Sequence, residues 1–138
     1  MGISEKVDKL IKKYKTRCPY AIADMSNISI RREGLPNGIM GIAVKALRRK
    51  YIILSINNDI HIDRFVCAHE LGHHTLHPGY SYKFITNSLF VNDKYEKQAN
   101  EFAVKLLIDP ETLKYGRTKQ EIAQLNGLPF EVIDKILR

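Results

Sequence analysis

Five residues, His69-Glu70-Leu71-Gly72-His73, constrain the fold of this 138-residue chain more than any other feature. They continue the apolar run Phe65–Ala68, which predicts a helix that is mostly buried in the core. Polar side chains on such a helix need partners, because burying a polar group without a hydrogen bond costs several kcal/mol. The fold must therefore gather these groups around a metal ion or satisfy them with hydrogen bonds alone, and we favour the metal.

The spacing of this motif assigns a role to each polar residue. Residues four apart share one face of a helix, so His69 and His73 can bind one ion. Glu70 lies roughly 100° around the helix from His69, where it can act as general base on a water molecule without becoming a ligand. We also expect His77, or alternatively Tyr80 or Tyr82 from the following loop, to help stabilise the oxyanion of the reaction.

A catalytic metal needs a further protein ligand, and a second strong helix is predicted over residues 93–108. Glu96 and Asn100 lie on one face of it together with small alanines, which would let the two helices pack closely. We expect Glu96 to be the third ligand, with His77, Asp93 or no further residue as the alternatives. Asn100 can accept a hydrogen bond from the free N–H of a ligand histidine and thereby fix its tautomer. Two histidines and one carboxylate favour a single zinc ion, although this set also suits non-haem iron.

The remaining patterns predict an α+β domain built around these two helices. The helices are expected over residues 3–15, 19–25, 63–74 with Asp63 as N-cap, 93–108, 118–126 and 130–137. The strands are expected over residues 28–32, 39–46 and 51–56, with a further short strand near 83–86 as an option. We predict a small three-stranded, mostly antiparallel sheet, and a loop over residues 80–92 that is long enough to be a lid. Residues 1–110 would form the catalytic domain, with 111–138 packed on it as a helix-turn-helix-like pair.

The composition indicates a cytoplasmic protein. The longest apolar run, residues 51–56, is far shorter than the roughly 20 residues of a membrane helix. Residues 1–15 carry five lysines but no apolar stretch, so they do not resemble a signal peptide. Cys18 and Cys67 match no metal or redox pattern. The net charge of +7 is spread over the chain, with one basic patch at 45–50 in an expected hairpin connection, which favours a solvated surface over a nucleic-acid or acidic protein partner.

The two motif helices resemble those of the ImmA/IrrE metallopeptidases, gluzincin-like proteins of bacteria, phages and integrative elements. The resemblance is carried by His69-Glu70-Leu71-Gly72-His73 with Leu76-His77, and by Glu96-x-x-Ala-Asn100-x-Phe-Ala103-x-x-Leu-Leu107. The order of elements is similar over roughly residues 20–138. The resemblance implies a minimal zincin-like fold, Glu96 as third zinc ligand, and limited proteolysis of a transcriptional repressor. Asn100 departs from the gluzincin aspartate, and Leu107-Ile-Asp-Pro110 departs from the usual Leu-Met-Pro.

Two functions are therefore compared. The first is a zinc endopeptidase that cleaves a protein, a helix-turn-helix repressor by the resemblance, as the anti-repressor of a phage or mobile element. The second is a regulatory module that binds protein or DNA and has a structural or vestigial metal site. Ala123 and Gly127 fit the spacing of a helix-turn-helix, but Glu131 and Asp134 on its second helix would repel phosphate. We therefore favour the peptidase and expect no DNA partner.

Overall fold

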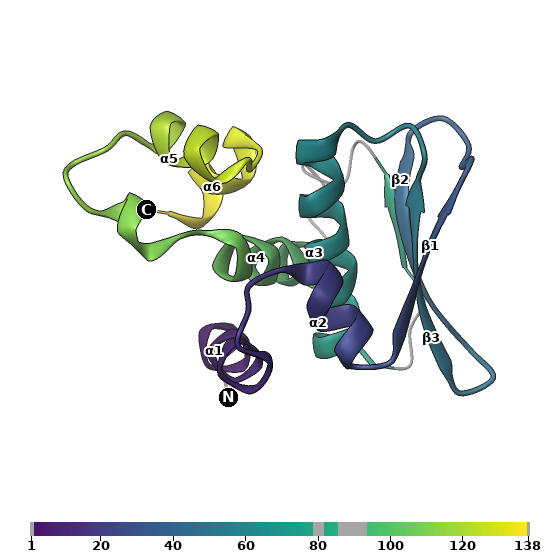
Figure 1. The fold of residues 1–138 in the computed structure, drawn as a ribbon. Helices are drawn as coiled ribbons and strands as arrows, with labels where there is room; N and C mark the ends of the chain where they lie inside the picture. Colours follow the sequence, from purple (N-terminus) through teal and green to yellow (C-terminus); the bar gives the residue numbers. More distant parts are fainter. Residues whose placement is uncertain (1, 79–81, 86–93, 138) are drawn as a thin grey trace.

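A mixed sheet with helices on one face is the framework of the molecule (Figure 1). The computed structural model describes residues 2–78, 82–85 and 94–137. The helices in these ranges are α1 (Ile3–Tyr14), α2 (Pro19–Met25), α3 (Ile60–Leu76), α4 (Lys94–Leu107), the 3-10 turn η2 (Pro110–Leu113), α5 (Lys119–Asn126) and α6 (Phe130–Ile136). The strands are β1 (Ile28–Glu33), β2 (Ile39–Ala46), β3 (Arg49–Ser55) and β4 (Tyr82–Ile85). The predicted α+β class and each predicted helix are therefore present.

The sheet is mostly antiparallel, as predicted, and it also contains one parallel pair. Its order is β1-β3-β2-β4, with β1 parallel to β3 and the other two pairs antiparallel. The turn at Leu47 and Arg48, both with positive φ, joins β2 and β3 into a hairpin. The connection 34–38 is long enough to leave a gap between β1 and β2, and β3 lies in this gap and pairs with both strands. The three predicted strands are all present, and β4 extends the sheet at the position given as an option.

The inner face of the sheet packs on α2 and α3 (Figure 1). Side chains point alternately to the two faces of β2 and β3, and Ile52 and Leu54 of β3 and Ala43 of β2 are fully buried on the inner face. Gly41 of β2 also lies on this face, because a Cβ built there would come within 2.5 Å of Val66 Cγ1 on α3. Gly41 therefore allows the strand to approach the helix closely.

Helix α3 begins one turn earlier than predicted. Its N-cap is Asp59, whose side chain accepts hydrogen bonds from the backbone N–H groups of His61 and Ile62. Asp63, the predicted N-cap, is instead buried and bound to Arg32 by two hydrogen bonds of 2.8 Å. The prediction was wrong because a tertiary partner, which local spacing does not reveal, holds the second aspartate.

The C-terminal helices share the core of the rest of the chain. Val132 and Ile133 of α6 belong to the same buried cluster as Phe102 of α4. α5 has a full capping box between Thr118 and Glu121, and it ends at Gly127 in the left-handed conformation. The division at residue 110 stays a prediction. None of the helices in the described ranges has both the length and the apolar character needed to span a bilayer.

Candidate metal centre

Three buried side chains converge at the interface of α3 and α4. His69 and His73 lie on consecutive turns of α3, and Glu96 lies in the first turn of α4. The Nε2 atoms of the two histidines are 3.2 Å apart, and Glu96 places one carboxylate oxygen 2.9 Å from His69 Nε2 and the other 2.8 Å from His73 Nε2. The predicted third ligand therefore meets the paired histidines, although α3 and α4 are separated in the sequence.

The geometry and chemistry of this cluster fit a metal ion. One ligand atom from each residue can be chosen so that all three lie within 4.8 Å of one another. A tetrahedral zinc ion with bonds near 2.0–2.1 Å holds its ligand atoms roughly 3.3 Å apart, close to the spacing of the two Nε2 atoms. Burial opposes ionisation of Glu96, but hydrogen bonds and Coulomb attraction from both histidines outweigh it and lower its pKa to about 2. Glu96 is thus an anion at neutral pH, as a metal ligand must be.

Close packing of α3 and α4 produces this convergence. Gly72 lies against Phe102, and a Cβ built on the glycine would stand 3.0 Å from the Phe102 ring. Ala99 and Ala103 of α4 are fully buried, as expected from their small size. The contribution of the glycine in the motif was not predicted, because a glycine inside a helix gives no sign of which neighbour needs the space.

The second ring nitrogen of each histidine in the cluster also has a partner. Asn100 Oδ1 lies 2.8 Å from His69 Nδ1, which is the contact expected for an orienting residue. His77 Nδ1 lies 3.1 Å from His73 Nδ1. His77 therefore stands behind His73 and outside the cluster, which does not support its alternative role as the third ligand. Asp93, the other alternative, lies outside the described residues.

Glu70 differs from its neighbours on α3. It is fully buried, and neither carboxylate oxygen has a hydrogen-bond partner within the described part of the chain. Burial, together with the negative charge of Glu96, raises the pKa of Glu70 well above its usual value. A carboxylate in such surroundings is a stronger base than one in water. Its predicted role as general base stays a prediction.

Other residues around the cluster were missed or lie outside the described ranges. His74 was not singled out, and its Nε2 lies 2.8 Å from the carbonyl oxygen of Tyr51, where it ties α3 to β3. Gln98 and Tyr95 on α4, which contact His77, were also missed. Nothing in their spacing from the motif indicates these contacts, since they depend on how the helices pack. Tyr80, most of the expected lid and the side chain of Tyr82 are not described.

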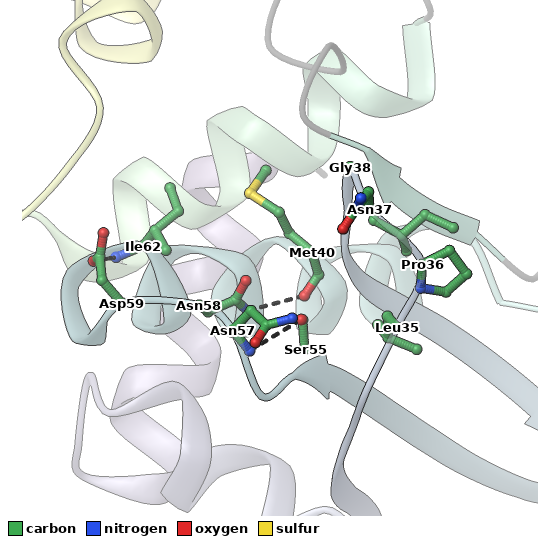
Figure 2. Close-up of a pocket in the computed structure, with 11 residues that line it drawn as sticks. Leu35, Pro36, Asn37, Gly38, Met40, Ser55, Asn57, Asn58, Asp59 and Ile62 are labelled. Atoms are coloured by element: carbon green, nitrogen blue, oxygen red, sulfur yellow. Dashed lines mark hydrogen bonds between the residues drawn. The ribbon is translucent and has the colours of Figure 1, made fainter.

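A separate hollow of about 410 Å³ lies between the 35–39 connection and the start of α3 (Figure 2). Asn58 donates a hydrogen bond of 2.9 Å to the carbonyl oxygen of Met40, and the backbone N–H of Asn57 donates to Ser55 Oγ. The residues that line this hollow include none of the three that form the cluster. The buried metal centre and this hollow are therefore different places on the molecule.

Comparison with known proteins agrees with this geometry. The sequence profile of the IrrE N-terminal-like domain matches residues 22–138. The chain belongs to this family.

Relatives of known name support the same assignment. "Metallopeptidase ImmA" of Bacillus subtilis (strain 168) is 34% identical over 142 aligned residues, which cover 96% of this chain and 82% of that protein. "Uncharacterized immunity region protein 2" of Bacillus phage phi105 is 42% identical over 135 residues, which cover 94% of this chain and 85% of that protein. The chain is therefore a metallopeptidase of the ImmA/IrrE family with a His-His-Glu site that can hold one metal ion.

Proposed function

We propose that this chain is a zinc endopeptidase that cleaves a transcriptional repressor at a specific site and so acts as the anti-repressor of a phage or mobile element. The observation that carries the proposal is the meeting of His69, His73 and Glu96 beside the buried carboxylate of Glu70, which has no hydrogen-bond partner among the described residues. The proposal of a repressor substrate is supported by the name of the phage relative, which refers to an immunity region.

Each polar residue has a defined task in this proposal. His69, His73 and Glu96 would hold zinc, whose chemistry here is Lewis acidity that lowers the pKa of water toward roughly 7 and polarises the scissile carbonyl. Glu70 takes a proton from the attacking water as the water oxygen bonds to the carbonyl carbon. Glu70 then gives that proton to the amide nitrogen as the carbon–nitrogen bond breaks. The products are a new carboxyl terminus and a new amino terminus.

The test separates metal binding from proton transfer. Glu70→Gln keeps the size of the side chain but removes its basicity, so this variant should bind zinc at wild-type stoichiometry and cleave nothing. Zinc is measured by elemental mass spectrometry. Cleavage is measured by co-expression with the repressors encoded beside this chain, followed by mass spectrometry of the fragments. Glu101→Gln is the control, because it also removes one negative charge, but at the surface of α4, where Glu101 pairs with Lys105. It should change neither the zinc stoichiometry nor the cleavage.

Two results would contradict the proposal. Cleavage by Glu70→Gln at the wild-type rate would exclude Glu70 as the base. A wild-type protein that binds zinc but leaves every neighbouring repressor intact would favour the regulatory binding module. DNA binding measured against salt concentration would then identify a DNA-binding role, because several phosphate contacts give a steep loss of affinity.

A further inference from the structure

A hydrogen-bonded chain runs from the metal centre to the surface of α4 through His77. His77 is the C-cap residue of α3 and is only 6% exposed. Its backbone N–H donates to the carbonyl oxygen of His73 at 2.8 Å, which places the two rings side by side. Its Nδ1 lies 3.1 Å from His73 Nδ1, and its Nε2 lies 2.7 Å from Gln98 Oε1. Both ring nitrogens of His77 are therefore engaged.

The direction of this chain follows from which atoms can donate. The amide oxygen of Gln98 only accepts, so His77 Nε2 must carry the hydrogen. A neutral imidazole carries one ring hydrogen, so His77 Nδ1 is a bare acceptor. His73 Nδ1 must then donate to it, so His73 Nε2 is the nitrogen that can give its lone pair to a metal ion held with Glu96 and His69. This is the only neutral tautomer of His73 in which Nε2 can bind a metal.

We propose that His77 and Gln98 are positioning residues that fix the metal-binding tautomer of His73. Tyr95 supports them, because its ring lies 4.2 Å from the His77 ring at 34° and holds the plane of that imidazole. The inference extends the proposed function by giving His73 an orienting pair, just as Asn100 orients His69. It also replaces the expected role of His77 at the oxyanion, since His77 faces the back of a ligand.

Two substitutions at Gln98 test the acceptor chemistry with little change of shape. Gln98→Glu keeps an oxygen acceptor for His77, so zinc affinity should stay at or above the wild-type value. Gln98→Met fills a similar volume without a comparable acceptor, and zinc should bind roughly tenfold or more weakly, as is usual when the partner of a ligand histidine is lost. Affinity is measured by competition with a fluorescent zinc chelator, and the absorption spectrum of the cobalt-substituted protein reports the ligand geometry. Glu101→Gln is the surface control on the same helix.

The zinc affinities and thermal stabilities of the two Gln98 variants distinguish a positioning role of Gln98 from a merely structural one. A merely structural role would lower the thermal stability of metal-free Gln98→Glu and Gln98→Met alike and weaken zinc equally in both. Equal zinc affinities in these two variants, whether weakened or unchanged, would overturn the proposal.

The tautomer itself gives a readout that is independent of proteolysis. Long-range ¹H–¹⁵N correlation spectra of the wild-type protein should show the His77 hydrogen on Nε2 and none on Nδ1, with or without zinc. A hydrogen on Nδ1 would refute the assignment even if the protein is an active peptidase. Conversely, failure to cleave any repressor would leave this spectrum and the Gln98 affinities unchanged, so the two proposals fail separately.

Discussion

Gly41→Ala should damage catalysis more than metal binding, because the new methyl group has no room between β2 and α3. A Cβ at this position would lie 2.5 Å from Val66 Cγ1, whereas carbon atoms in contact stand about 3.5–4.0 Å apart. β2 and α3 must therefore separate by about 1 Å. Such overpacking costs about 1–3 kcal/mol, of which the lower chain entropy of alanine offsets about 0.5–1 kcal/mol. The free energy of unfolding should fall by about 1–2 kcal/mol.

The same displacement reaches Glu70, the carboxylate proposed as general base. Glu70 lies one turn beyond Val66, and its Cγ would be 3.4 Å from the new methyl group. A misplacement of about 1 Å can reduce turnover about 100-fold, so cleavage should fall by about 10- to 100-fold. Neither His69 nor His73 is among the three nearest neighbours of the new methyl group, and both contact Glu96 of α4, so zinc affinity should change by less than about threefold.

A double-mutant cycle gives the decisive measurement. Val66→Ala removes the atom that Gly41→Ala strikes, and alone it should cost about 2–3 kcal/mol through the cavity it leaves. The double variant should be about 1–2 kcal/mol more stable than the sum of the two single changes, as measured by urea unfolding of the metal-free proteins followed by circular dichroism. Additivity within about 0.5 kcal/mol would show that no steric clash connects the two positions, and the reasoning would be wrong.

Three other predictions concern the cap of α4, a buried carboxylate and the metal. Arg17 Nη1 lies within 3.2 Å of three carbonyl oxygens at the end of α4, so Arg17→Met should lower the free energy of unfolding by about 1–2 kcal/mol in urea titrations, and an unchanged midpoint would exclude this cap. Burial alone would raise the pKa of Asp63, but hydrogen bonds from Arg32, Tyr20 and Asn58 outweigh it and hold this pKa below its usual value. The stabilisation by the Asp63 carboxylate is therefore complete above the pKa of Asp63 in the unfolded chain, and it is lost as pH falls through the lower pKa of Asp63 in the folded protein. Asp63→Asn should therefore lower the free energy of unfolding more at pH 7 than at pH 3 in parallel urea titrations. An equal loss at both pH values would contradict this. Zinc at about 100 times its Kd should raise the free energy of unfolding of the wild-type protein by about 2.7 kcal/mol. This is measured as a rise in Tm that a chelator reverses, and zinc should raise the Tm of Glu96→Ala much less.

The sequence was most informative where one helix carries the chemistry. The spacing of His69, Glu70 and His73 on α3 depends only on helical periodicity, so their placement could be predicted without knowing the fold. Glu96 could be predicted because it shares a face with small residues that permit close packing, although the fit of Gly72 against Phe102 was not foreseen. Apart from the start of α3, helix bounds also agreed closely, since capping residues and periodic apolar positions are local signals.

Properties that depend on distant segments could not be derived in this way. The order β1-β3-β2-β4 requires β3 to enter between two earlier strands, and strand composition alone does not specify such an order. Asp63 has the local sequence of an N-cap, but in the folded protein its side chain is bound to Arg32 on β1. Gln98 points to His77 only because α4 crosses α3 at that level. In each case the deciding contact joins residues whose separation in the sequence carries no periodic signal.

The burial of α3 explains why one of its polar residues differs from the others and is proposed as the general base. Every residue from Phe65 to His74 is buried, so this stretch has no solvent-facing side on which polar groups could be hydrated. The histidines of this stretch have partners on neighbouring elements: His69 with Asn100 and Glu96, His73 with His77 and Glu96, and His74 with the Tyr51 carbonyl. Among the described residues, Glu70 is the exception. An unpaired buried carboxylate costs stability, and the proposed role of Glu70 would account for this cost, because the attacking water would then be its partner during the reaction.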